Sequence, residues 1–512
     1  MSNFHSTITR RDFMKALGLT GVGLSAAGTT APIFHDLEEV SSSAWGNWER
    51  PWWVKEREFG NPTMEVNWNE IPRYNMLDNL WMAHSLARYL GPTRTAQCFA
   101  SAAKEKIDGI RNNVPGQTLR DLSLQSGAYM FFSTYYPSQK LKSWLGPQTT
   151  EQMGISATPE ELGVPKWEGT PEENLKMLRA AMRFYGVSQI GVTELGTRER
   201  QLISTTDVGN FRSPQYTFSS DPSNIAKLGA KRYVFENVDK AYEGDDKFVI
   251  PEKPLWVVSI AIQMSKELFR HGLGVLRAAA NGSRYRIHAI SQTLTQNFLR
   301  GIGYQGMGYP TTAFGPSLAN ASAILSGLAE IGRNNNYVNS PEYGSICGYF
   351  SLITDLPLAP TPPIDAGMFR FCHICRKCAE ICPAQAISYD SEPSWEIKPS
   401  SVAPNLEPLW TTGGKRTFHT DSPKCGEFFY SRSGSCGSCM GNCVFNTNTS
   451  AMVHDMVKAT ISSTSLFNGF LWNADKTFGY GLTPDEEKEE WWNMSLPLFG
   501  QDGSIGASDG GY

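Results

Sequence analysis

Hydrophobic spacing is clearest after residue 166, where helical and strand-like patterns alternate. Residues 170–173 (Thr-Pro-Glu-Glu) supply an N-cap, a proline at the first helical position and a capping-box glutamate. The apolar positions that follow lie on one face of a helix, namely Leu175, Leu178, Met182 and Tyr185. The pattern predicts a helix that ends at Gly186, because glycine is common just past the last helical turn.

Further elements follow from shorter patterns. Residues 189–193 and 254–262 are short segments rich in apolar and β-branched residues, which are typical of buried strands. Residues 79–90, 286–302 and 317–331 predict helices, and glycines close the last two. Because helices and strands are mixed, we expect a layered α/β or α+β domain.

Three segments indicate how the chain is organised. Residues 33–60 include Pro-Trp-Trp-Val-Lys at 51–55 in a polar setting, which indicates an extended arm. Residues 356–363 are rich in proline and predict a stiff linker that leads into a cysteine-rich window. Helical spacing resumes at 453–463, so the cysteine-rich window is expected to be an insertion within a larger domain.

The composition is that of an ordinary globular protein. The chain has 512 residues, of which 40% are hydrophobic and 19% charged, enough for one large core or two to three domains. The net charge of −4 gives no reason to expect a nucleic-acid partner. The 14 tryptophans are compatible with an aromatic core or with a site for a large flat cofactor. No stretch after the N-terminus is apolar and long enough to span a bilayer, so membrane attachment is expected through a partner.

The N-terminus is typical of a Tat export signal. Arg10 and Arg11 precede a short apolar run, residues 16–32, that glycines interrupt. We expect residues 1–31 to be a Tat signal peptide, with a chance arginine pair in a cytoplasmic amphipathic start as the alternative. The Tat route carries folded cargo, so it predicts cofactor insertion before export to the outer face of the cytoplasmic membrane. The cleavage site stays open.

Eight of the ten cysteines lie in one window. The first run has the spacing Cys-x2-Cys-x2-Cys-x3-Cys-Pro of bacterial ferredoxins, and the second has Cys-x10-Cys-x2-Cys-x3-Cys. In two-cluster ferredoxins the fourth cysteine of a run binds the other cluster. We therefore predict two [4Fe–4S] clusters, the first on Cys372, Cys375, Cys378 and Cys443 and the second on Cys382, Cys425, Cys436 and Cys439.

Other uses of these cysteines are four disulfides or zinc knuckles, but the crowded first run and the Tat leader favour clusters. We expect Cys98 and Cys347, outside the window, to be buried thiols. The chain has no GxGxxG after a strand, no HExxH and no Asp-x-His-x-x-Gly of the kind that gives cobalamin a histidine ligand. A bare electron carrier would need only the cysteine window, so the rest of the chain indicates a second redox centre or a substrate site.

Several sequence motifs, taken together, resemble those of the catalytic subunit of corrinoid-dependent reductive dehalogenases. They combine the leader motif and the cysteine pattern with the segments 51–55, 166–172, 353–358 and 363–367. The resemblance covers the leader and most of residues 160–480 and is weak between 60 and 160. It implies an α+β fold in which a nitroreductase-like, corrinoid-binding domain carries an inserted ferredoxin-like module with two [4Fe–4S] clusters. It also implies a cobalamin-type corrinoid bound base-off, without a protein ligand below the cobalt.

The resemblance also implies domain limits. Residues 32–165 are expected to form an N-terminal region that contributes to the corrinoid domain, with the nitroreductase-like core at 166–360. The ferredoxin-like module is expected at 361–450, and residues 451–512 are expected to return to the core.

The family uses a tyrosine as proton donor above the cobalt, before a helix that ends in Gly-Tyr. Tyr285 stands at that distance from Gly303-Tyr304, so the resemblance assigns it this role. Phenols are protonated at neutral pH, and a neighbouring cation stabilises the phenolate left after donation. Arg284 and Arg286 flank Tyr285 and are the candidate cations. Judged without the resemblance, Tyr285 is a half-buried tyrosine at the start of a helix.

Two polar residues of the family have no counterpart here. The family's arginine, which follows a Pro-Glu-aromatic-Gly turn, falls at Gly348, and the family's asparagine falls near Phe314. What assists Tyr285 is therefore open. The replacement candidates are Arg284, Arg286, His288 and Tyr309, although His288 is also explained as a packed helix residue.

The resemblance implies a reductive dehalogenase that replaces halogen by hydrogen on a small organohalide in anaerobic respiration. A membrane-anchor subunit and an electron-donating respiratory partner would serve it. The alternatives are an exported iron–sulfur electron-transfer protein and an epoxyqueuosine reductase-like corrinoid enzyme, although the leader and the acidic net charge disfavour a tRNA substrate. Which organohalide is reduced, the lower ligand of the corrinoid and the oligomeric state stay open.

Overall fold

The computed structural model describes most of the chain after the leader. The residues described are 50–129, 143–148, 155–210, 218–310, 314–446, 452–477 and 481–494. The predicted Tat signal, residues 1–31, lies outside them. Within these ranges no helix has the length and apolar character needed to cross a membrane.

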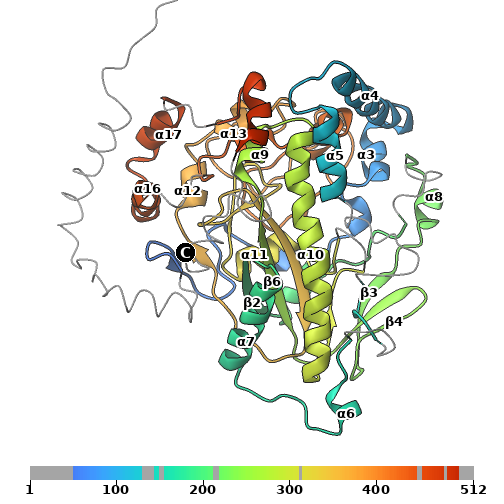
Figure 1. Ribbon diagram of the computed structural model, residues 1–512. Coiled ribbons are helices and arrows are strands. Elements are labelled where there is room, and N and C mark those ends of the chain that lie inside the picture. Colours follow the sequence, from blue (N-terminus) through green and yellow to red (C-terminus); the bar gives the residue numbers. More distant parts are fainter. Residues whose placement is uncertain are drawn as a thin grey trace, which may run out of the picture.

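A four-stranded antiparallel sheet forms the centre of the described structure (Figure 1). Its strands run in the order β2 (Gln189–Glu194), β6 (Trp256–Gln263), β10 (Cys347–Thr354) and β7 (Gly306–Met307). Both strands that the apolar runs predicted are therefore confirmed. Every residue of β10 is buried, because helices and loops cover both faces of the sheet.

The two faces of the sheet pack against different helices. On one face, Val258 and Phe350 belong to a core shared with α7 (Pro171–Phe184) and α10 (Val275–Ile302). On the other face, Ala261 and Tyr349 pack with α11 (Ala319–Leu325). Figure 1 shows α7 and α10 lying across the front of the strands and α11 behind. The protein is thus an α+β fold, as the sequence predicted.

Helix α7 has the cap that the sequence predicted. The Thr170 hydroxyl accepts a hydrogen bond from the Glu173 N–H, and the Glu173 carboxylate accepts one from the Thr170 N–H. The helix ends at Phe184, and Gly186 adopts the left-handed backbone (φ 93°) that allows the chain to turn. Its apolar stripe, including Leu178, is buried against the sheet.

The helix predicted at 286–302 begins much earlier, at Val275. The predicted start was wrong because Gly282, an unfavourable residue inside a helix, is accommodated here by close packing. A Cβ on Gly282 would lie 2.6 Å from the ring of Tyr129, which follows α5 (Leu119–Ala128). Tyr285 therefore lies inside α10 and not before its start.

The helix predicted at 317–331 is also shorter than expected. Helix α11 ends at Leu325, and β8 (Glu330–Ile331) then pairs with β9 (Val338–Asn339). The chain turns at Gly327, whose φ is 74°, and a Cβ there would lie 2.1 Å from the Pro362 carbonyl oxygen. The helix predicted at 79–90 forms only over α3 (Ala83–Leu90).

The predicted extended arm pairs with the entry to the cysteine-rich window. Strand β1 (Lys55–Glu56) is antiparallel to β11 (Ile364–Asp365). A separate sheet combines β3 (Arg232–Glu236), β5 (Lys247–Pro251) and β4 (Tyr242–Glu243), at the right in Figure 1.

The remaining elements are mostly short. The helices before the window are α4 (Pro92–Arg111), α6 (Pro159–Leu162), α8 (Pro222–Ala226) and α9 (Lys266–Arg270). Those from the window onward are α12 (Met368–Cys372), α13 (Lys377–Glu380), α14 (Ser422–Ser431), α15 (Ser438–Gly441), α16 (Met452–Ser463) and α17 (Asn468–Thr477). The 3-10 helices are η1 (Trp68–Glu70), η2 (Met76–Asp78), η3 (Glu199–Leu202) and η4 (Asp485–Asn493).

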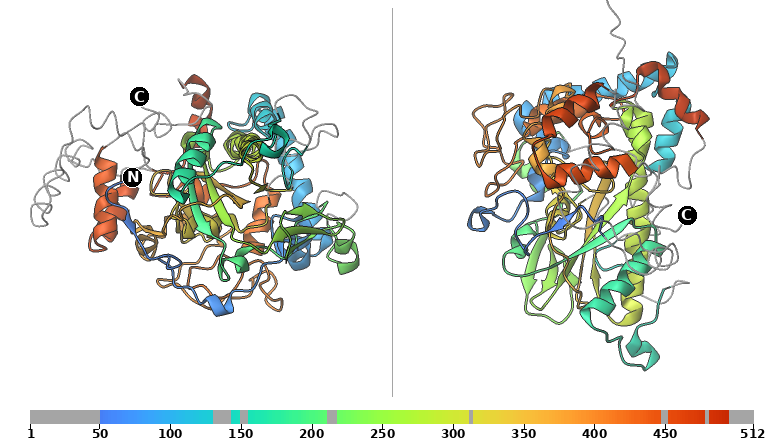
Figure 2. Two further views of the ribbon diagram at one scale, coloured as in Figure 1. Left: turned by 90° about the horizontal axis from the view of Figure 1, so that it is seen from below. Right: turned by 90° about the vertical axis from the view of Figure 1, so that its left-hand side faces the viewer.

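Helix α16 confirms the helical spacing predicted at 453–463. Helix α16 packs against the start of the cysteine-rich window, because Ala459 and Ile461 share a core with Phe371 and Cys375. Figure 2 shows the arrangement of the elements from two further directions. The predicted domain limits, and the nitroreductase-like and ferredoxin-like character of the parts, stay predictions.

Candidate functional site

One large cavity connects α10 with the cysteine-rich window. Its volume is about 840 Å³, within the range of small-molecule and cofactor sites. Arg284 and Tyr285 line it from α10, and Cys425 and Cys436 line it from the window. Much of the remaining wall is aromatic, including Trp81, Tyr129, Tyr337, Trp410, Phe429 and Tyr430. A cavity of this size and lining suits a large, largely apolar ligand.

Arg284 is paired with Tyr285 at the cavity wall. The Arg284 Nη2 donates a hydrogen bond to the Tyr285 phenolic oxygen over 2.8 Å, and the guanidinium lies 4.6 Å from the centroid of the same ring. Burial lowers the pKa of Arg284, but its interactions with Tyr285 and Tyr337 outweigh burial and raise that pKa overall. Arg284 is therefore a cation beside the phenol at any physiological pH.

Gly348 makes this pairing possible. A Cβ at Gly348 would lie 2.4 Å from Cδ of Arg284 and 2.9 Å from its Cβ, so the arginine occupies the space that a side chain on β10 would need. Thus the position at which the resemblance expects an arginine holds a glycine, and the Arg284 side chain fills the space beside it. Phe314, at the expected asparagine position, lines the cavity and packs near Met76 without offering a polar group.

The other replacement candidates lie in different surroundings. Tyr309 is buried and lines the cavity, and burial raises its pKa. His288 is buried, and its ring stacks on Phe350 with the centroids 3.8 Å apart, so the interpretation as a packed helix residue is confirmed. Arg286 is half-buried and is not one of the residues that line the cavity. The structure therefore brings together Tyr285, Arg284 and Tyr309.

Two neighbours of Tyr285 had not been predicted. Asn281 Nδ2 donates a hydrogen bond to the Tyr129 phenolic oxygen over 2.7 Å, and the Tyr129 and Tyr285 rings lie 6.2 Å apart. Asn281 precedes Tyr285 by four positions, which places both on one face of α10. That spacing would have identified Asn281 from the sequence if the helix had been predicted from its true start.

The cysteines of the window interact electrostatically in the structure. The pKa of Cys378 is raised by burial and by the nearby thiols Cys372, Cys375, Cys439 and Cys443. The pKa of Cys425 is raised by burial and by the thiols of Cys436 and Cys382. All ten cysteines are free thiols, and Cys98 and Cys347 are buried as predicted.

The division of the eight cysteines into two ligand sets stays a prediction, because Cys439 of the second set also interacts with Cys378 of the first. Burial raises the pKa of Cys372 to about 12, so the thiol would ionise only with a metal or cation beside it. Within the described residues, no three His, Cys, Asp or Glu side chains converge on a site for a single ion. The four thiolates of one [4Fe–4S] cluster bind different irons, so they do not need to converge in this way.

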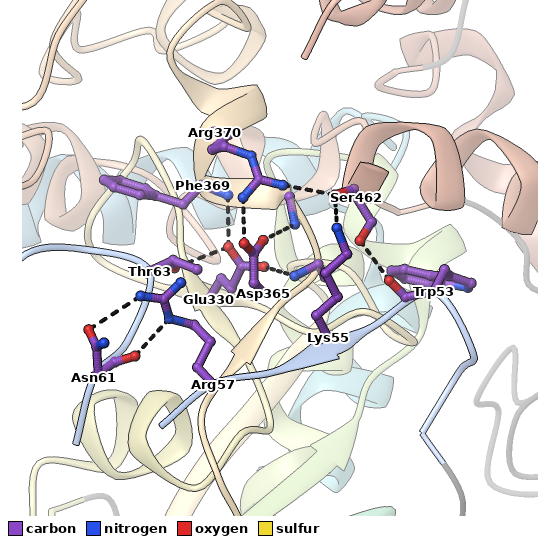
Figure 3. Close-up of polar contacts among 12 residues, drawn as sticks. Trp53, Lys55, Arg57, Asn61, Thr63, Glu330, Asp365, Phe369, Arg370 and Ser462 are labelled. Atoms are coloured by element: carbon purple, nitrogen blue, oxygen red, sulfur yellow. Dashed lines mark hydrogen bonds and ion pairs between the residues drawn. The ribbon is translucent and has the colours of Figure 1, made fainter. Parts of the chain in front are cut away.

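The buried carboxylate of Glu330 binds the segment that leads into the first cysteine run (Figure 3). Glu330 accepts hydrogen bonds from the N–H of Phe369 over 3.1 Å, from the N–H of Ala366 and from the hydroxyl of Thr63 over 3.1 Å. Figure 3 also shows Arg370 between Asp365 and the Ser462 carbonyl. Burial raises the pKa of Glu330 to about 7, although these N–H bonds lower it.

Comparison with known proteins places the chain in a family. Residues 49–358 match the family model described as "Reductive dehalogenase subunit". The chain is 30% identical over 545 residues to "Chloroethene reductive dehalogenase" of Dehalococcoides mccartyi (strain VS), covering 98% of this chain and 99% of that relative. It is 29% identical over 571 residues to "Trichloroethene reductive dehalogenase" of Dehalococcoides mccartyi (strain ATCC BAA-2266 / KCTC 15142 / 195), covering 97% and 98%.

A solved structure shares the fold. "Catabolic reductive dehalogenase NpRdhA" superposes with a TM-score of 0.55 at 16% identity, over 84% of this chain and 49% of the solved one. The chain thus spans about half the length of that solved protein. The structural class is an α+β protein with a large cavity beside the central sheet. The chain belongs to the reductive dehalogenase family, whose members are oxidoreductases that act on carbon–halogen bonds.

Proposed function

We propose that this protein replaces halogen by hydrogen on a small organohalide in anaerobic respiration, with a base-off corrinoid in the 840 Å³ cavity and two [4Fe–4S] clusters in the cysteine-rich window. The observation that carries the proposal is the cavity itself. One wall presents the phenol of Tyr285 with its bonded Arg284, and another presents Cys425 and Cys436. The proposed proton donor and the proposed redox relay thus border the same cavity.

The cavity residues suit a corrinoid. The wall is rich in aromatic rings that can pack against a flat macrocycle, and none of its described lining residues is a histidine. A corrinoid bound there would supply low-valent cobalt as the reductant of the carbon–halogen bond. The protein would contribute orientation, the exclusion of water and a proton.

The two cysteine sets differ in their distance from this cavity. Cys425 and Cys436, of the second set, line the wall, whereas none of the first set does. The second set, completed by Cys382 and Cys439, would therefore hold the cluster next to the corrinoid. The first set would hold the cluster that receives electrons from a partner protein. The ligands of this first cluster would be Cys372, Cys375, Cys378 and Cys443.

Tyr285 would deliver the proton that replaces halide. Its hydroxyl oxygen accepts a hydrogen bond from Arg284, a bond that does not use the phenolic proton, and Tyr285 lines the cavity. When the proton leaves, the phenolate oxygen would keep a charge-assisted hydrogen bond from Arg284, which is worth about 1.5–3 kcal/mol. Arg284 would therefore act by stabilising the charge that develops on Tyr285.

Substrate, location and partners follow from the family and the leader. Chlorinated ethenes are the first substrates to test, because the two full-length relatives are named for them. The twin-arginine leader supports export to the outer face of the cytoplasmic membrane, where a membrane-anchor subunit would hold the enzyme.

The test is the release of halide by the reconstituted holoenzyme with reduced methyl viologen as electron donor. We expect turnover of at least one chlorinated ethene, and a fall of roughly 100- to 10,000-fold in Tyr285→Phe, as for the loss of a general acid. Tyr389→Phe, a change at an exposed tyrosine, is the matched control and should keep the wild-type rate. Holoenzyme with both clusters but no bound corrinoid would instead support the electron-transfer alternative.

A further inference from the structure

Arg333 is a buried cation whose hydrogen-bond donors are directed at the first cysteine run. Its side chain is 1% exposed. Nε lies 3.0 Å from the Cys372 carbonyl and 2.9 Å from the Cys375 carbonyl, and Nη2 lies 2.6 Å from the Cys372 carbonyl and 3.2 Å from the His373 carbonyl. Nη1 bonds the carbonyls of Ser388 and Asp390 over 2.9 and 2.8 Å. All five N–H donors of the guanidinium thus bond neutral backbone carbonyls.

The charge of Arg333 has no carboxylate partner in the part of the chain that the structure describes. Asp390 influences it only at longer range, because that carboxylate is on the surface and pairs with Lys398 over 3.2 Å. Lys377, a buried cation within the first cysteine run, is by contrast paired with Asp475. A buried charge without an opposite charge is costly, and the Phe418 ring, 4.0 Å from the guanidinium, compensates only part of that cost.

The groups that favour the charge of Arg333 are thiols of the first set, namely Cys372, Cys378 and Cys375, whereas the nearby Arg376 repels it. A [4Fe–4S] cluster bound by four thiolates is anionic and gains further negative charge on reduction. Such a cluster would be the opposite charge that Arg333 lacks.

The segment that carries Arg333 contacts both ends of α12, the short helix that ends at Cys372. Glu330, three residues earlier, accepts the N–H groups at the start of α12, and Arg333 donates to carbonyls at its end. The free N–H and C=O groups of a short helix are thereby satisfied with charges of the favourable sign. The position of the cysteine loop is therefore set from β8 and the turn after it.

We propose that Arg333 is a positioning residue for the first cluster, which shapes its cysteine loop and raises its reduction potential through an uncompensated buried positive charge. The inference rests on the proposed function, since it assumes a cluster on the first cysteine set. Hydrogen bonds and charge near a cluster are among the factors that set its potential. Removing the charge would destabilise the reduced, more negative cluster and lower its potential.

The test is an anaerobic redox titration of the reconstituted holoenzyme, followed by electron paramagnetic resonance. In Arg333→Gln we expect the reduction equilibrium constant of one cluster to fall on the order of tenfold, or about 59 mV for one electron, while the other cluster keeps its potential. Arg333→Lys keeps the charge but loses the planar fork, so it should retain most of the potential. Arg376→Gln removes a partly exposed charge from the same loop, where water screens it, and should shift the potential much less.

The outcomes separate this inference from the proposed function. If Arg333→Gln assembles only one cluster, the positioning role is supported. The effect of the charge on the reduction potential of the first cluster is then measured in Arg333→Lys. The inference would be overturned if the reduction potentials of both clusters were unchanged in Arg333→Gln. It would also be overturned if Arg333→Gln and Arg376→Gln shifted the potential equally. Wild-type protein that binds no iron at these cysteines would overturn the proposed function itself, whatever Arg333 does.

Discussion

Gly348→Ala is predicted to disable Tyr285 without touching it. Gly348 lies in β10 opposite Ile262, and its backbone is outside the left-handed region, so alanine meets no backbone strain there. The added Cβ would lie 2.4 Å from Cδ of Arg284, far inside van der Waals contact. Arg284 must therefore move, and its hydrogen bond of 2.8 Å to the Tyr285 oxygen is lost or lengthened.

The size of the effect follows from the bond that is lost. A hydrogen bond to a charged group contributes about 1.5–3 kcal/mol, and each 1.36 kcal/mol changes a rate tenfold. The phenolate needs Arg284 more than the phenol does, so the loss falls mainly on the transition state. We expect kcat to fall roughly 10- to 150-fold with little change in KM.

The assay is steady-state halide release at matched iron and corrinoid content, for Gly348→Ala, Tyr285→Phe and the double variant. Because Gly348 acts through Arg284 on Tyr285, the double variant should be no slower than Tyr285→Phe alone. Gly469→Ala, at a glycine with nothing within 4 Å of the added Cβ, is the matched control. A wild-type rate in Gly348→Ala, or a further tenfold loss in the double variant, would refute the reasoning.

Three further predictions concern stability and ligand assignment. Burial raises the pKa of Glu330 from 4.5 to about 7, so the folded state keeps this proton to higher pH than the unfolded chain does. The free energy of unfolding of the wild type should therefore fall by about 2–3 kcal/mol more than that of Glu330→Gln between pH 5 and pH 8, as measured by anaerobic denaturant unfolding. The same pH dependence of the unfolding free energy in both proteins would contradict this. Leu178→Ala removes a side chain with 0% exposure between α7 and the sheet and should cost about 2–5 kcal/mol in the same denaturant assay, and a loss below about 1 kcal/mol would show that α7 packs elsewhere. Cys347→Ser should keep the full iron content, whereas Cys425→Ser should lose iron; loss of iron in Cys347→Ser would disprove the ligand assignment.

Local signals in the sequence were enough to predict the elements that local interactions define. The capping box at Thr170 and the apolar runs of β2 and β6 lie within a few residues of the structures that they specify. The true start of α10 was missed because Gly282 is favourable there only through its contact with Tyr129, which is remote in the chain. Likewise, the end of α11 depends on the approach of Gly327 to Pro362.

In the candidate site, too, local sequence patterns allowed predictions, whereas contacts between remote residues could not be predicted. The spacing of the cysteines predicted two sets of four, because the ferredoxin pattern is local in the sequence and gives the fourth cysteine of each run to the other cluster. This assignment stays a prediction. The pairing of Arg284 with Tyr285 was open, because adjacent helix residues normally point in different directions. It depends on space at Gly348, a residue of another element, and the sequence does not show which side chain fills that space.

The central claim is that one cavity joins a cobalt macrocycle to two iron–sulfur clusters, and metal analysis of the anaerobically reconstituted protein tests it most directly. We predict about eight irons and one cobalt per chain. A chain that binds about four irons, or that takes up no cobalt from a supplied corrinoid, would contradict the account.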